Sequence, residues 1–177
     1  IIGSNVEFKR NVTAGNTDIS NGATLNSLGN ITSNINGTTA NSGTLNMNGS
    51  SQTVTGNIGN TNSLQNFNVT SGTTTLTGNL NATNTNISNG ATLNSQGNIT
   101  SNVNGATANS GNLVTSGTNQ LVTGNIGDTN SLQNFNVISG ITTLNGNLTS
   151  TNTDITNNST LKISDGKTIT STILSSD

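Results

Sequence analysis

The sequence predicts an all-β parallel β-helix, or β-solenoid, in which short strands stack coil upon coil. Segment 16–83 recurs without a gap as segment 84–151, with 51 identities in 68 aligned positions. A fixed period of this kind is typical of solenoids and other repeat arrays. Asn, Ser, Thr and Gly dominate, whereas 27% of the residues are hydrophobic and 6% are charged. These are too few apolar residues for a large globular core, so a thin, repetitive core is favoured.

The chain is expected to form a single repetitive β-solenoid segment. A partial repeat covers 1–15, two full repeats cover 16–83 and 84–151, and a third, partial repeat covers 152–177. Because the chain opens on Ile1 and the third repeat stops early, we expect a fragment of a longer protein.

Intrinsic disorder is the main alternative for so polar a chain. Disordered segments usually contain many charged residues and Pro, but this chain has ten charged residues in 177 and no Pro. Apolar residues also recur at alternate positions, as at Phe67 and Val69 or at Leu161 and Ile163, which is the pattern of strands. Since Asn, Gly, Ser and Thr are poor helix formers, stacked strands with ladders of identical side chains are favoured.

The tripeptide Gly-Asn-apolar divides each repeat into coils. It begins at Gly29, Gly56 and Gly78, and the next repeat starts the series again at Gly97. Three coils per 68-residue repeat gives about 22–23 residues per coil, enough for three short strands joined by turns. We expect these pairs at the corners, because Gly accepts a positive φ and Asn tolerates the left-handed region.

Asn-Gly pairs leave an antiparallel alternative open. Asn-Gly is the usual two-residue turn of a β-hairpin, and the pair occurs at Asn21, Asn36, Asn48, Asn89, Asn104 and Asn145. Long exact repeats with a Gly-Asn-apolar step favour instead coils stacked in parallel, about 4.8 Å apart. In such a stack Leu64, Phe67 and Val69 are expected core residues.

The seventeen differences between the two full repeats are unevenly spread. Seven fall between Thr44 and Thr53, which align with Asn112 to Leu121. The favoured interpretation is an outward loop, because loops tolerate change. A surface that contacts a ligand and varies between the copies is the alternative.

The composition argues against an enzyme. The chain has no His and no Cys, so Ser-His-Asp and Cys-His arrangements, and zinc sites built on these residues, are impossible. Some β-helix enzymes use paired carboxylates, but Asp18 and Asp154 lie two repeats apart with Asn86 between them, and Asp128 replaces Asn60. Exchange between Asp and Asn at equivalent positions suits turn residues and not an acid/base pair. The acids are Glu7, Asp18, Asp128, Asp154, Asp165 and Asp177. We expect no catalytic, cofactor-binding or metal residues, and no cofactor or calcium.

Charge and hydropathy limit the classes of partner that this chain can bind. The net charge is -2, and the cations are Lys9, Arg10, Lys162 and Lys167, too few and too scattered for nucleic-acid binding. No apolar stretch approaches the roughly 20 residues of a membrane helix, so no membrane insertion is expected in this segment. The open edges at the solenoid ends would pair with further coils or with copies of the same protein.

The stretch VTGNIGNTNSLQNFNVTSGTTTLTGNL, at 54–80 and again with changes at 122–148, resembles the passenger domains of rickettsial surface autotransporters. These are surface cell antigens of the outer-membrane protein A and B family. In them a Gly-Asn-Ile step leads through Thr-Asn-x-Leu to an alternating apolar strand and then to Thr-Leu-x-Gly-Asn. The resemblance implies a secreted, right-handed parallel β-helix on a bacterial surface. It also implies anchorage in the outer membrane through a region outside this chain, and a virulence role in adhesion to and entry into host cells.

We therefore expect a structural and adhesive segment of a secreted, extracellular bacterial surface protein, with a host-cell surface protein or glycan as partner. A phage tail fibre and a two-partner-secreted haemagglutinin-like stalk are the alternatives. An ice-binding solenoid is more distant, because Thr-Asn-Thr at 83–85 and 151–153 recurs once per repeat and not on every coil.

Overall fold

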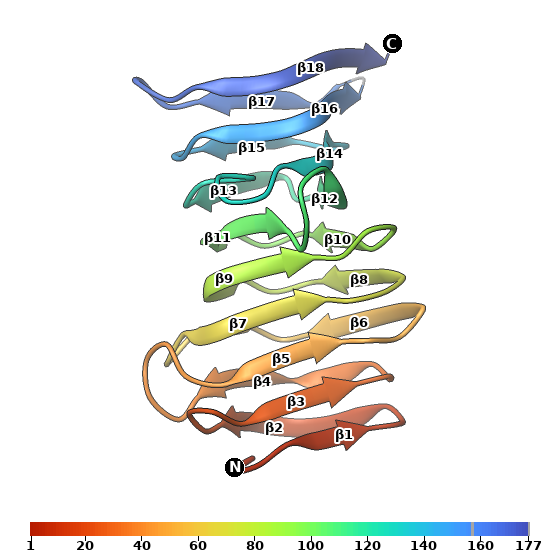
Figure 1. Cartoon of the computed structure of the whole chain (residues 1–177), viewed down its shortest axis with the longest axis vertical. Coiled ribbons are helices and arrows are strands. Elements are labelled where there is room, and N and C mark those ends of the chain that lie inside the picture. Colours follow the sequence, from red (N-terminus) through yellow and green to blue (C-terminus); the bar gives the residue numbers. More distant parts are fainter. Residues whose placement is uncertain (157, 177) are drawn as a thin grey trace.

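A computed structural model describes residues 1–156 and 158–176, which form strands joined by turns (Figure 1). These residues contain no helix long and apolar enough to cross a membrane. In chain order the strands are β1 (Val6–Phe8), β2 (Val12–Ile19), β3 (Thr24–Ser27), β4 (Ile31–Gly37), β5 (Thr44–Met47), β6 (Ser51–Thr55), β7 (Leu64–Val69), β8 (Thr73–Leu76), β9 (Leu80–Ile87), β10 (Thr92–Ser95), β11 (Ile99–Gly105), β12 (Ser110–Thr115), β13 (Asn119–Thr123), β14 (Leu132–Val137), β15 (Ile141–Leu144), β16 (Leu148–Thr156), β17 (Thr160–Ile163) and β18 (Ile169–Ser176).

Every pairing between these strands is parallel, and each strand pairs with the strand two positions farther along the chain. Hydrogen bonds thus link the odd-numbered strands in one series of nine and the even-numbered strands in another. The prediction of an all-β parallel solenoid is confirmed. The antiparallel meander is excluded for the described residues, because neighbours along the chain do not form hairpins.

Each turn of the solenoid has three sides, because the long strands bend round a corner. The ladder between β9 and β11 shifts its register between Thr100 and Asn102, and two other long ladders, β2 with β4 and β16 with β18, shift in the same way. The two halves of such a strand belong to different faces. Backbone pairing then defines three columns of stacked residues. Face 1 holds Val6, Leu25, Leu45, Phe67, Thr85, Val103, Ile126, Leu148 and Ile169; face 2 holds Val12, Ile31, Val54, Leu76, Ser95, Thr115, Val137, Ile155 and Ser175; face 3 holds Thr17, Ile35, Ile58, Leu80, Ile99, Val122, Leu144 and Ile163.

The turns are shorter on average than the sequence led us to expect, and they differ in length. The column of face 2 climbs from Val12 to Ser175 in eight steps, and the mean turn takes about 20 residues, a length within the range of solenoid repeats. A turn is as short as 18 residues between Asn68 and Asn86, and as long as 23 residues between Asn30 and Thr53, where it includes the loop 38–43. Loops lengthen some turns and not others, so no single coil length describes the chain.

The 68-residue repeat consequently takes three and a third turns, and the expected three coils per repeat is wrong. Ser95 lies three turns above Ile31 on face 2, whereas the equivalent of Ile31 in the second repeat is Ile99, four residues farther on and on face 3. The prediction counted each interval between Gly-Asn-apolar steps as one coil, and this is wrong for the longest interval. It spans a turn and a third, because it leads from Ile31 on face 2 to Ile58 on face 3. Successive repeats therefore present equivalent residues on successive faces.

Side chains from the three faces meet in one continuous core along the axis. Leu64, Phe67 and Val69 are completely buried, which confirms their prediction as core residues. Hydroxyl groups also point inward and bond to one another, as Thr85 does with Ser101 at 2.8 Å. Such pairing removes the cost of burying a lone hydroxyl, so Ser and Thr supplement the few apolar residues.

Asparagine side chains hold the corners of adjacent turns together. The Gly-Asn steps lie at corners, as predicted, but their Asn residues act through the side chain and not through a left-handed backbone. Oδ1 of Asn57 accepts a hydrogen bond from the N–H of Asn79, and Oδ1 of Asn79 accepts one from the N–H of Asn98, both at 2.8 Å. Gly78 is required here because a Cβ atom would collide with the carbonyl oxygen of Gly56 in the turn below.

A buried glutamine closes an inner corner in each repeat. Gln52 is 2% exposed, and its Nε2 donates to the carbonyl oxygens of Ser27 at 3.0 Å and Gly29 at 2.8 Å. Its Oε1 accepts from the N–H of Gly49 at 2.7 Å. Gln120 makes the equivalent three bonds in the second repeat. The side chain thus gives the N–H of Gly49 a partner and adds a bond to two carbonyl oxygens at the corner of the turn below.

Candidate binding surface

The structure keeps the acidic side chains apart. Asp18 points outward on face 3 near one end, and Asp154 points outward on face 2 near the other. Within the described ranges no group of three acids is close enough to hold a metal ion. The exposed acids Glu7, Asp128 and Asp165 lie at separate levels, and Asp177 lies outside the described residues. The surface that merits functional attention is instead built from neutral polar groups.

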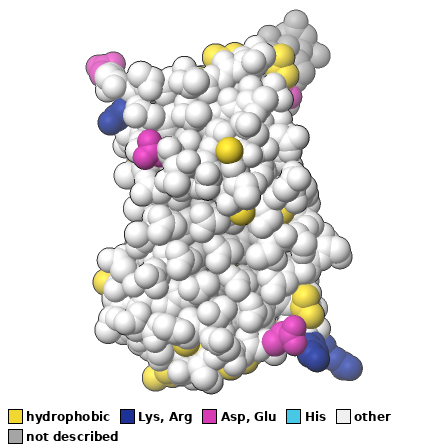
Figure 2. All heavy atoms as spheres, viewed as in Figure 1, with side chains coloured by type: hydrophobic (Ala, Val, Ile, Leu, Met, Phe, Trp, Pro, Cys, Tyr) yellow, Lys and Arg dark blue, Asp and Glu magenta, His cyan; other side chains and the backbone are white. Residues whose placement is uncertain are grey.

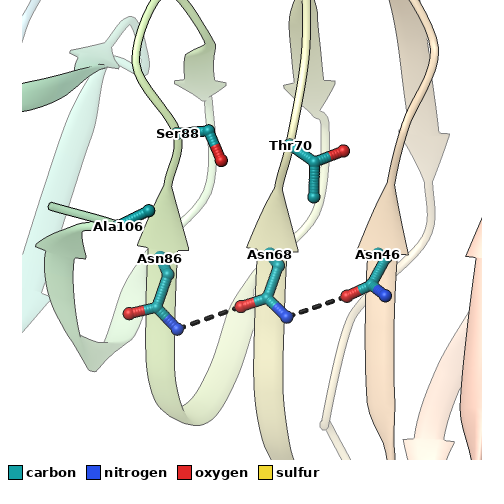
Figure 3. A pocket seen from close by; sticks show the side chains of 6 residues that line it. All are labelled: Asn46, Asn68, Thr70, Asn86, Ser88 and Ala106. Carbon is teal, nitrogen blue, oxygen red and sulfur yellow. Dashed lines mark hydrogen bonds between the residues drawn. The ribbon is translucent and has the colours of Figure 1, made fainter.

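Four asparagines form an amide ladder on the outer surface of face 1. Asn26, Asn46, Asn68 and Asn86 stand in register on β3, β5, β7 and β9. Nδ2 of each of the upper three donates to Oδ1 of the residue below, at 2.8, 2.8 and 3.0 Å going up the ladder, and Figure 3 shows the upper two bonds. An amide has two N–H groups and two lone pairs on oxygen. Asn46 and Asn68 therefore keep one donor and one acceptor position each beyond the ladder.

The ladder arises from strand alternation combined with the particular lengths of three successive turns. Asn46 and Asn68 follow the inward residues Leu45 and Phe67, so they point outward. Successive asparagines of the ladder are separated by 20, 22 and 18 residues. A change of one residue in any of these turns would break the stack of amides.

This amide ladder borders a shallow hollow of about 490 Å³. Its lining consists of amides of β5, β7 and β9 and of small side chains in the turns that follow β7, β9 and β11 (Figure 3). Thr70 is held at the edge, where its hydroxyl lies 2.6 Å from Oδ1 of Asn48. Among the described residues the lining has no ionisable side chain and comprises Asn46, Asn68, Thr70, Asn86, Ser88 and Ala106. The hollow is thus a neutral surface of amides and hydroxyls.

The equivalent surface of the second repeat lies on face 2 and has a different chemistry. Val114 and Ile138 stand where the first repeat has Asn46 and Thr70. Val114 pairs in register with Asn136, so it interrupts the column of amides, and the side chain of Ile138 is 44% exposed. The two repeats therefore share a backbone but present a polar surface in one case and a partly apolar one in the other.

The segment in which the repeats differ most is not a loop, contrary to the favoured interpretation of 44–53. It contains strand β5 and most of strand β6. Asn46 points outward between the buried residues Leu45 and Met47. The segment looked like a loop because its outward positions vary freely, but its inward positions pack in the core. The alternative, a ligand-contacting surface that varies between the copies, stays a prediction.

A second, smaller hollow of about 220 Å³ lies beside the protruding loop 38–43. Asn41 in this loop has a φ of 57°, and its Oδ1 accepts hydrogen bonds from Ser63 at 2.8 Å and from Thr83 at 2.9 Å. The side-chain oxygen and the backbone N–H of Asn41 thus join the loop to the turns above. The amide-lined hollow on face 1 is the stronger candidate, because it is larger and its three amides are aligned by the ladder.

None of the residues that line the hollow was predicted individually as a binding residue, although Asn46 lies in segment 44–53, for which a ligand-contacting surface was the alternative. The available signal was the alternation of outward Asn with inward Leu or Phe, as at Leu45-Asn46 and Phe67-Asn68. That pattern shows that the amides point outward. It does not show that the amides stack, because stacking depends on the lengths of the turns. The Gly-Asn spacing led to the wrong turn lengths.

Comparison of the chain with protein-family models, with characterised proteins and with solved structures gave no match. The solenoid architecture is therefore established by the strand pairing alone.

Proposed function

We propose that this chain is a structural and adhesive segment of a secreted bacterial surface protein. In this role it projects from the cell and contributes to attachment to host cells or other surfaces. The observation that carries the proposal is the unbroken stacking of three columns over about eight turns. At about 4.8 Å per turn the rod is about 38 Å long. Because each turn is stabilised mainly by its two neighbours, such a rod can be lengthened without a change of design.

The outer surface supports a role in contact with solvent and partners. Outward positions are mostly Asn, Thr and Ser, and the net charge is only -2. On the side drawn in Figure 2, the charged side chains lie toward the two ends and the middle is uncharged. Such faces offer many hydrogen-bonding groups, which suits a host-cell surface protein or glycan as the partner.

The resemblance of 54–80 to rickettsial autotransporter passengers supports the bacterial cell surface as the location. On this proposal the anchor in the outer membrane belongs to a region outside this chain. The described segment then serves as part of the extracellular stalk.

The proposal is tested by the attachment of coated beads to cultured epithelial cells. The full chain can be coupled in one orientation through a cysteine appended to its C-terminus, because the sequence has no other cysteine. Beads that display the chain should attach several-fold more often than beads coated with albumin through the same linker. Equal attachment of the two kinds of bead would rule out adhesion by this segment.

A further inference from the structure

We infer that the hollow on face 1 is a binding site for a neutral glycan, recognised through its hydroxyl groups. The groups that would contact it are those of Asn46, Asn68, Thr70, Asn86 and Ser88. This inference rests on the proposed adhesive function, and it assigns that function to one surface and one class of ligand.

The charge and polarity of the hollow select an uncharged, hydroxyl-rich ligand. An anionic ligand needs Arg or Lys to form strong, charge-assisted hydrogen bonds, and the described residues that line the hollow include neither. An apolar ligand would cover the amides and leave their free positions without partners, which is unfavourable. A neutral glycan avoids both costs, because its hydroxyls replace water as hydrogen-bond partners.

The donors and acceptors of the hollow are ordered before any ligand binds. The bonds between Asn46, Asn68 and Asn86 fix the orientation of the amide groups, with Nδ2 pointing down the ladder. The remaining N–H and lone pair therefore recur at the spacing of the rungs, about 4.8 Å. A sugar hydroxyl both donates and accepts, so adjacent hydroxyls can bond to successive rungs. Little side-chain entropy is lost on binding, because the amides are already held.

The second repeat shows that the fold requires neither Asn46 nor Thr70. Val114 and Ile138 occupy the positions of Asn46 and Thr70 on the same local backbone. An exchange at these positions therefore alters the surface of the hollow without disturbing the inward residues. This provides a test in which binding can be lost while folding is retained.

The test is a glycan array with the full chain and two variants. The array displays neutral oligosaccharides that end in mannose, galactose or glucose, each beside a sialylated or sulfated counterpart. The first variant, Asn46→Val with Thr70→Ile, gives the hollow the residues of the second repeat. The matched control, Asn136→Val, removes an outward amide of the same kind from face 2. Circular dichroism verifies that both variants keep the β spectrum of the full chain.

The full chain should bind at least one neutral glycan. The hollow variant should bind it about tenfold or more weakly, because ligand hydroxyls would face apolar groups, and the control should bind it unchanged. The inference is overturned if millimolar neutral glycan shows no binding, if only charged glycans bind, or if the hollow variant binds as well as the full chain.

The bead assay separates this inference from the proposed adhesive function. Beads coated with the hollow variant should lose attachment to cells. Beads coated with the full chain should lose attachment to cells whose surface glycans have been removed by glycosidases. If beads with the hollow variant still attach, and beads with the full chain still attach to the treated cells, adhesion stands and the glycan site is wrong. If the full chain binds neutral glycans on the array but its beads do not attach to cells, the glycan site stands and the adhesive function is wrong.

Discussion

At the residue scale, the two repeats treat one buried threonine differently. Oγ1 of Thr142 donates to Oγ1 of Thr115 at 2.8 Å. In the first repeat Met47 takes the place of Thr115, and Oγ1 of the equivalent Thr74 is buried without a hydrogen-bond partner among the described residues. An unpaired buried hydroxyl costs about 1–3 kcal/mol. The first repeat thus gains the larger apolar side chain at the expense of one unsatisfied group.

Replacing each threonine by valine should have effects of opposite sign. Thr74→Val should stabilise the protein by about 1 kcal/mol, because it removes an unsatisfied hydroxyl while nearly preserving volume. Thr142→Val should destabilise it by about 1 kcal/mol, because it breaks the bond to Thr115. Urea unfolding followed by circular dichroism measures both changes. Destabilisation of the same size in both variants would contradict this account of the two positions.

Glycine serves two different purposes at two turns that need a positive φ. Gly90 and Gly127 have φ values of +73° and +71°, but a Cβ atom at Gly90 meets nothing within 4 Å, whereas one at Gly127 would collide with the carbonyl oxygen of Thr149. Gly90→Ala should cost about 1–2 kcal/mol, the penalty of the left-handed conformation. Gly127→Ala should cost clearly more, because the turn above must also move. Thermal melting of the two variants compares them, and equal melting temperatures would contradict the close approach.

At the scale of elements, the buried glutamine joins the corners of two adjacent turns. Gln120→Leu should cost about 1–3 kcal/mol, because the N–H of Gly117 loses its partner and the carbonyl oxygens of Ser95 and Gly97 each lose one of the bonds that they accept. The control is Gln133→Leu on the exposed side of β14, where the change should stay within about 0.5 kcal/mol. Urea unfolding of both variants is the measurement. Similar losses would show that the buried bonds contribute little.

The sequence predicted those elements whose signal is local. Alternation at Phe67 and Val69 identified strand and core, and the Gly-Asn steps identified corners. The number of turns per repeat was mistaken, because the step at Ile58 lies one face beyond that at Ile31, and a spacing in sequence does not reveal a change of face. Gln52 was missed because Gln is usually exposed, and its role depends on contacts across adjacent turns.

At the scale of the whole molecule, removal of one full repeat should leave a shorter, folded rod. Deleting 84–151 joins Thr83 to Asn152, which reproduces the native junction of Thr83 with Asn84. The strands above then rotate by one face and meet the same kinds of neighbour as before. Deleting 84–117 removes only half a repeat, so unlike segments would stack. Circular dichroism should show a native β signal per residue only in the first deletion, and scattering a rod shortened by about 16 Å.

A similar loss of β signal in both deletions would contradict the repeat as the unit of assembly.

The winding of three and a third turns per repeat is tested most directly by disulfide cross-linking. Asn68 and Asn86 lie on adjacent rungs with a separation of only 18 residues in the sequence, whereas three equal coils per repeat would place position 90 close above Asn68. Adjacent rungs are about 4.8 Å apart, within the Cα separation that a disulfide accepts, and the chain has no cysteine of its own. Under mild oxidation, Asn68→Cys with Asn86→Cys should form the bond rapidly, and Asn68→Cys with Gly90→Cys should remain reduced. Cross-linking of the second pair in preference to the first would contradict the three-sided winding described for this chain.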